Sequence, residues 1–70
     1  MTKDFSRSEI EYLINEWVIG KNAERDRQIM RRRLIDGICY EPLAEEFGLS
    51  TPQIKRIIYK RKNQIFRKHN

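Results

Sequence analysis

Cysteine and histidine are almost absent: Cys39 and His69 are the sole examples in 70 residues. One cysteine excludes a disulfide framework and is typical of a reducing compartment. These two residues also fall short of the four ligands of a structural zinc site, so we expect no metal. Cys39 is interpreted as a small buried residue, because no histidine lies in the same region to activate it as a nucleophile.

Long apolar runs are also missing. None approaches the ~20 residues that a membrane-spanning helix requires, and residues 1–4 lack the apolar segment of a secretion signal. We therefore expect a soluble, cytoplasmic protein that makes no contact with a membrane. A chain of 70 residues suffices for one small domain, which leaves no second layer to wall an enzyme pocket. With no glycine-rich phosphate loop and no catalytic partner for its acids, the chain is expected to be no enzyme and to bind no cofactor.

Acidic residues are absent after Glu46, whereas residues 50–70 carry seven lysines and arginines. Residues 36–49 show the opposite bias, with four acids and no base, although the whole chain has a net charge of +5. Such segregation favours a polyanionic partner more than an evenly spread charge would. The alternative interpretation is a basic tail that is simply solvated.

Apolar residues recur at spacings of three and four, which predicts helices, and no segment alternates as a strand would. We expect an all-α, small four-helix domain over residues 1–70, with helices at about 7–19, 23–36, 40–47 and 51–67. Ser6 with Glu9, and Ser50 with Gln53, have the spacing of capping boxes at the starts of the first and last helix. Asn22 is the expected N-cap of the second helix. The residues expected to face inward are Ile10, Leu13, Ile14, Trp17, Val18, Ile29, Met30, Leu34, Leu43, Ala44, Phe47, Ile54, Ile57, Ile58 and Ile65.

The junction of the third and fourth expected helices has the spacing of a C-terminal helix-turn-helix, built by Ala44, Gly48, Leu49, Ile54 and Ile57. Ala44 is small enough for the two helices to cross closely, and Gly48 can adopt the positive φ of a sharp turn. Leu49 and Ile54 would fill the angle between the helices. The last helix is long and basic, which distinguishes this arrangement from the alternative, an ordinary corner between two helices.

A last helix in this position would present its first turns to the major groove of DNA, where Arg, Lys and Gln read base edges. The residues expected to approach base edges are Ser50, Thr51, Gln53, Lys55, Arg56 and Tyr59. The residues expected to contact phosphates are Lys60, Arg61 and Lys62, with Arg31 and Arg32 on the exposed side of the second helix. For Tyr59 a packed or half-exposed ring is the alternative. Arg33 is expected to pair with Glu41 or Glu45 inside the domain rather than with phosphate.

Residues 25–65 contain a series of motifs in a fixed order. Arg25 and Asp26 open a helix, residues 33–37 (RLIDG) end it, and the segments 40–45 (YEPLAE) and 48–50 (GLS) follow. This series resembles the promoter-reading fourth region of sigma-70-type bacterial sigma factors, and it is similar to the tetrahelical output domains of response regulators. The resemblance implies a helix-turn-helix whose last helix lies in the major groove of double-stranded DNA.

Three residues depart from that family pattern. Cys39 replaces the usual hydroxyl cap of the third helix, Pro42 stands in place of a second glutamate, and Arg32 occupies a position that is usually apolar. The chain also has no room for the sigma regions that bind core polymerase and melt DNA. It therefore resembles the small stand-alone regulators of phages and mobile elements, by analogy of fold.

We interpret the sequence as a sequence-specific DNA-binding transcriptional regulator. The alternative is a small protein-binding module or inhibitor on the same fold, which acts on RNA polymerase or another nucleic-acid enzyme through the acidic segment 36–46. Tyr59 and Phe66, like Tyr12 and Ile19, lie seven residues apart and off the main apolar stripes. They suggest a homodimer seam, and lateral packing within the core is the alternative.

Overall fold

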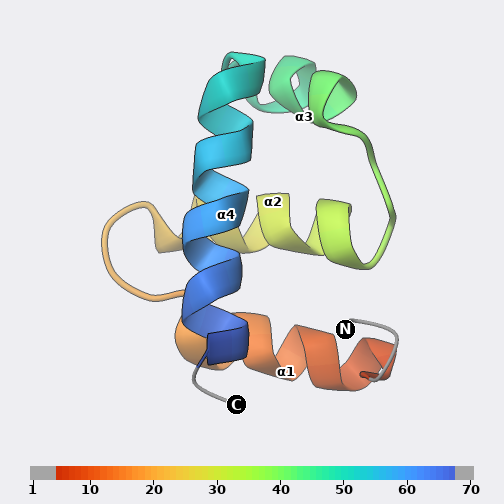
Figure 1. Cartoon of the computed structure of the whole chain (residues 1–70), viewed down its shortest axis with the longest axis vertical. Helices are drawn as coiled ribbons and strands as arrows, with labels where there is room; N and C mark the ends of the chain where they lie inside the picture. The colour runs from red at the N-terminus through yellow and green to blue at the C-terminus, as the bar shows by residue number, and fades with distance from the viewer. Residues whose placement is uncertain (1–4, 68–70) are drawn as a thin grey trace.

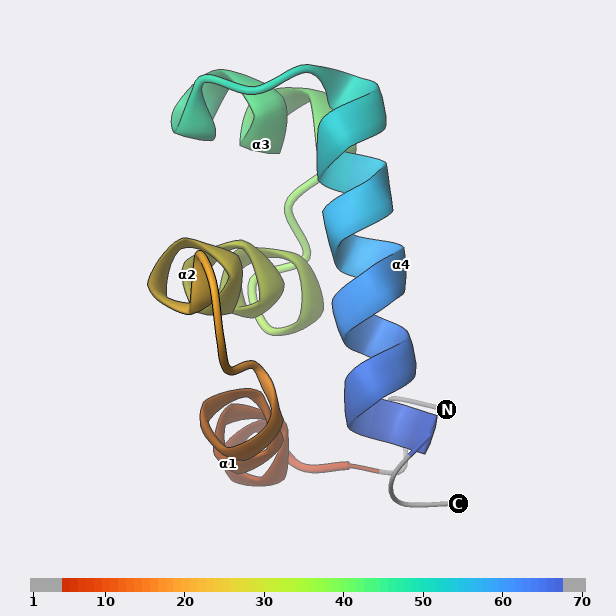
Figure 2. The ribbon, with the colours of Figure 1, turned by 90° about the vertical axis from the view of Figure 1, so that its left-hand side faces the viewer.

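The computed structural model describes residues 5–67, and within this range the chain forms α-helices and no strand (Figure 1). The helices are α1 (Arg7–Trp17), α2 (Ala23–Leu34), α3 (Tyr40–Phe47) and α4 (Thr51–Arg67). α1, α2 and α3 lie at successive levels on one side of α4, and no helix within residues 5–67 covers the opposite side (Figure 2). The prediction of an all-helical chain is confirmed for the described residues.

One apolar stripe of α4 joins the three levels. Ile54, Ile58 and Ile65 of this stripe are at most 1% exposed. Burial of each such side chain stabilises the fold by about 1.5–3 kcal/mol. The other buried apolar residues are Ile10, Leu13, Ile14, Val18, Ile29, Met30, Leu43 and Ala44, and the partly buried ones around them include Trp17, Leu34, Phe47, Leu49 and Ile57. The predicted inward faces of the helices are therefore confirmed.

The starts of α1 and α4 follow the predicted capping boxes. The backbone N–H of Glu9 donates to Ser6 Oγ at 3.2 Å, and the N–H of Ser6 donates back to Glu9 Oε1 at 2.9 Å. Ser50 and Gln53 make the same reciprocal pair at 3.3 and 2.9 Å. These bonds satisfy donors that have no partner inside the helix.

Asn22 occupies the N-cap position of α2, as predicted, but it does not cap the helix with its side chain. Asn22 adopts a left-handed backbone with φ 62°, and its side chain makes no capping bond. A capping side chain needs the extended backbone that Ser6 has, because only then does its oxygen reach the free N–H groups of the first turn. The N–H of Ala23 bonds instead to the carbonyl of Gly20 at 3.1 Å.

α1 and α2 each end two residues before the predicted position, because tertiary and turn contacts interrupt them. After Trp17 the chain is extended at Val18, whose carbonyl accepts a hydrogen bond from Arg27 Nε at 2.9 Å. After Leu34 the N–H groups of Asp36 and Ile38 fold back onto carbonyls of the last turn of α2, at 3.2 and 3.0 Å.

A short turn of residues 48–50 joins α3 to α4. Gly48 has φ 67° and ψ 33°, a left-handed conformation that ends α3. The N–H of Leu49 then bonds to the carbonyl of Ala44 at 2.9 Å. Ala44 is 6% exposed, which agrees with the prediction of a small residue where α3 packs against its neighbours.

Cys39 is exposed, so the prediction of a buried cysteine is wrong. It occupies the N-cap of α3 with an extended backbone and no side-chain cap bond. Ile38 and Tyr40, its two neighbours in the chain, are the residues of this segment that pack against the core.

Candidate nucleic-acid interface

The outer side of α4 is its most polar face. α1, α2 and α3 lie on one side of α4 (Figure 2), and the buried isoleucines of α4 belong to the core that these helices share. The exposed residues of α4 are Pro52, Gln53, Lys55, Arg56, Tyr59, Lys60 and Asn63, and Lys62 is half-buried. An α-helix of 17 residues is about 25 Å long at 1.5 Å per residue.

Positive charge on this face is uncompensated. α4 contains no acid. Among the described residues, Arg56, Lys60 and Lys62 have no ion pair or hydrogen-bond partner, and Lys55 contacts an aromatic ring rather than a carboxylate. We call these four residues the free bases of α4.

Arg61 belongs inside the molecule, and the prediction that it contacts phosphate does not fit this geometry. Its side chain is 5% exposed, and its Nε donates to Asp26 Oδ2 at 2.8 Å. Its other nitrogens donate to the carbonyls of Ile19 and Lys21, each at 3.1 Å, and to Gln64 Oε1 at 2.9 Å. The sequence contains a signal for the burial of Arg61, because position 61 lies seven residues after Ile54 and four before Ile65, on the buried stripe.

The arginines of α2 are also engaged within the domain. Arg31 donates to Asn15 Oδ1 at 2.7 Å. Arg32 makes ion pairs with Glu46 at 3.0 Å and Asp36 at 3.1 Å. Two hydrogen bonds raise the pKa of the Arg32 guanidinium: the bond to Glu46 has the largest effect, and the bond to Asp36 comes second. We therefore leave both arginines out of the candidate interface, although sequence alone predicted that they contact phosphate.

Arg33 does not pair with Glu41 or Glu45, contrary to prediction. One of its terminal nitrogens donates to the carbonyl of Ile38 at 3.1 Å, and its Cζ lies 4.5 Å from the centre of the Tyr40 ring. The Nζ of Lys55 lies 5.5 Å from the same ring centre. An attraction between a cation and the face of an aromatic ring holds both contacts.

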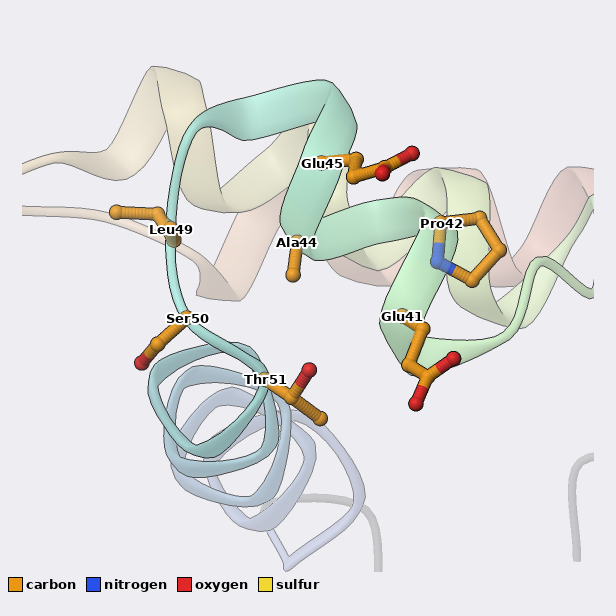
Figure 3. Close-up of a pocket in the computed structure, with 7 residues that line it drawn as sticks. All are labelled: Glu41, Pro42, Ala44, Glu45, Leu49, Ser50 and Thr51. Carbon is orange, nitrogen blue, oxygen red and sulfur yellow. The ribbon is translucent and has the colours of Figure 1, made fainter.

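The first residues of α4 divide between two tasks. Ser50 and Gln53 use their side-chain oxygens to cap the helix, so these predicted base contacts are partly committed to structure. Thr51 lines a groove between α3 and α4, together with Ser50 (Figure 3). The remaining lining residues are Glu41, Pro42, Ala44, Glu45 and Leu49. Arg56 and Tyr59 are the predicted base contacts that stay exposed without a structural bond.

The apolar strips that suggested a homodimer have different environments. Tyr12, Ile19 and Tyr59 are exposed at 60, 59 and 59%. Phe66 is half-buried, and its ring lies 5.4 Å from that of Phe5. The strip formed by Tyr59 and Phe66 is therefore half internal, as the alternative interpretation expected, and a seam through Tyr12 and Ile19 stays a prediction.

The described residues hold no group of three or more metal-ligating side chains; His69 lies outside them. No helix in this part of the chain is long and apolar enough to cross a membrane.

No protein-family model, no curated protein and no solved structure matches the chain.

Proposed function

We propose that this protein is a sequence-specific, double-stranded DNA-binding transcriptional regulator. In this proposal α3 and α4 act as a helix-turn-helix, and α4 enters the major groove. The observation that carries it is the uncompensated charge of α4, whose Lys55, Arg56, Lys60 and Lys62 have no acidic partner among the described residues. The resemblance of residues 25–65 to the fourth region of sigma factors supports the same proposal.

Dimensions and chemistry agree with this role. A major groove about 12 Å wide admits an α-helix, and the side of α4 that would enter it is covered by no other helix of the described part of the chain (Figure 2). Arg56 is the candidate reader of a guanine edge, because its guanidinium is exposed and uncommitted. Lys60 lies about one turn after Arg56, and Lys62 lies on the flank of α4 that carries Lys55. Both would contact phosphates on the rims of the groove.

The first test is selection of bound sequences from random duplex DNA at about 0.15 M salt. An enriched motif supports the proposal. A palindrome would further indicate a dimer, and its half-site spacing would give the separation of the two α4 helices. Retention without enrichment would contradict sequence-specific binding.

The role of Arg56 is tested by Arg56→Ala, with Lys62→Ala as its matched control. Loss of a bidentate base contact removes about 1–3 kcal/mol of discrimination, so we expect one position of the selected motif to relax. Lys62→Ala should weaken binding to all duplexes by similar factors, because a phosphate contact carries no sequence information. An unchanged motif in Arg56→Ala, or a loss confined to one sequence in Lys62→Ala, would contradict these assignments.

A second candidate function is favoured by the groove between α3 and α4. Glu41 and Glu45 lie on its border, and neither pairs with a base among the described residues (Figure 3). These carboxylates suit a basic segment of a protein partner, such as RNA polymerase or another nucleic-acid enzyme. Failure of the wild-type protein to bind any duplex at physiological salt would favour this function over DNA binding.

A further inference from the structure

Three elements meet at the ring of Tyr40, the first residue of α3. Arg33 approaches from the end of α2, with its Cζ 4.5 Å from the ring centre, and Lys55 approaches from α4, with its Nζ 5.5 Å away. The bond from Arg33 to the carbonyl of Ile38 uses one terminal nitrogen and fixes the guanidinium. One cation from the end of α2 and one from α4 therefore contact the same half-buried ring.

Neither cation has an acidic partner among the described residues. This distinguishes the cluster from Arg32, whose charge is compensated by Glu46 and Asp36. Each cation contacts the electron-rich ring and keeps hydrogen-bond donors unused: Arg33 donates one bond, to the carbonyl of Ile38, and Lys55 donates none among the described residues. The remaining donors of both groups are available to an anion.

The position of Lys55 on α4 indicates which anion this is. At 100° per residue, Lys55 lies on the flank of α4 that carries Thr51 and Lys62, about 100° from Arg56. Its contact with Tyr40 directs the ammonium toward the start of α3 rather than outward with Arg56. When α4 occupies a major groove, this flank faces the rim of the groove, where the phosphates are, and not the base edges.

We propose that Arg33, Tyr40 and Lys55 form a binding site for the phosphate backbone of duplex DNA, in which Tyr40 positions the Lys55 ammonium. The inference rests on the proposed function and deepens it. Lys55 becomes a phosphate contact instead of a base reader, and Tyr40 becomes a positioning residue. The contact with the ring limits the conformations of a long side chain, so less freedom is lost when the phosphate binds.

The test is a double-mutant cycle on the selected duplex and on an unrelated duplex. The variants are Lys55→Gln, Tyr40→Leu, the combination of the two, and Tyr40→Phe as the matched control that keeps the ring. Dissociation constants are measured between 0.05 and 0.2 M salt, and thermal unfolding shows that each variant is folded. Tyr40 is half-buried, so its replacement by another apolar residue is compatible with folding.

We expect Lys55→Gln to weaken binding to both duplexes by about threefold to tenfold and to reduce the slope of log K against log salt by about one. Tyr40→Leu should also weaken binding to both duplexes. Lys55→Gln should weaken binding clearly less when Tyr40→Leu is already present than it does in the wild type. Tyr40→Phe should bind as the wild type does. Arg33→Gln should likewise weaken both duplexes and lower the slope.

Three results would overturn the proposal. A change of sequence preference in Lys55→Gln would make Lys55 a base reader. Additive effects of Tyr40→Leu and Lys55→Gln would show that Tyr40 does not act through Lys55. A wild-type protein that binds no duplex would remove the proposed function and this site together, whereas the first two results remove the site alone.

Discussion

Asp26 and Arg61 are 5 and 4% exposed, and their ion pair ties α4 to α2. Removal of two charges from water is costly, and their attraction offsets this cost only when the remaining donors and acceptors are satisfied. Here Arg61 also donates to the carbonyls of Ile19 and Lys21, and Asp26 accepts a second bond from Arg25 Nε at 3.1 Å. No buried polar side-chain atom of the described residues lacks a partner.

We expect Asp26→Ala to lower the free energy of unfolding by about 3–5 kcal/mol, because it leaves the Arg61 guanidinium buried and unpaired. A domain of this size has a total stability of about 4–10 kcal/mol, so the variant should be close to unfolding. Urea denaturation measures the change. The matched control is Lys60→Ala, one residue from Arg61, which should change stability by less than about 0.5 kcal/mol. Equal effects of the two variants would contradict a special role for the buried pair.

Prediction from the sequence failed mainly for long cationic side chains. The buried isoleucines follow from spacing alone, since each lies on one face of its helix. Lys60, Arg61 and Lys62 are consecutive and chemically alike, yet Arg61 alone faces the core. Its partners, Asp26 and the carbonyls of the loop before α2, are 35 to 42 positions away in the sequence. No local pattern specifies such contacts, although the place of Arg61 on the apolar stripe of α4 was a usable signal.

At the scale of elements, the starts of helices were more predictable than their ends. Both predicted capping boxes formed, because their partners are only three residues apart. The ends of α1 and α2 depend on bonds from other parts of the chain, such as Arg27 to the carbonyl of Val18. α3 and α4 kept their predicted bounds, since Gly48 and Ser50 define the turn between them locally.

The turn between α3 and α4 depends on the backbone of Gly48. A Cβ added at this position would meet no atom within 4 Å, so substitution brings conformational strain and no clash. We expect Gly48→Ala to reduce the free energy of unfolding by about 1–2 kcal/mol, the cost of a left-handed backbone for an L-residue. Gly48→Asn should cost less, because asparagine tolerates this conformation better. Urea denaturation measures the free energy of unfolding of both variants. Equal losses would indicate that the left-handed φ of Gly48 is not the source of the cost.

At the scale of the whole molecule, the net charge of +5 conceals two different populations of bases. Arg32 and Arg61 are paired with acids inside the domain, whereas the free bases of α4 have no acidic partner among the described residues. Binding of a polyanion depends on the second population, because only an uncompensated cation releases a counterion from DNA without first breaking an internal bond. The number of free bases is therefore a better guide to the salt dependence of binding than the net charge.

The salt dependence of DNA binding should reflect this division. Lys55, Lys60 and Lys62, with Arg33, give about four phosphate contacts, and each contributes about −0.9 to the slope of log K against log salt. We expect a slope of about −4, so that affinity falls on the order of 10²-fold between 0.05 and 0.2 M salt. Fluorescence anisotropy with a labelled duplex measures it. A slope near −1 would argue against α4 as the DNA-binding surface. A slope near −5.5 would indicate that Arg31 and Arg32 leave Asn15, Asp36 and Glu46 for the DNA backbone, because two further contacts add about −1.8.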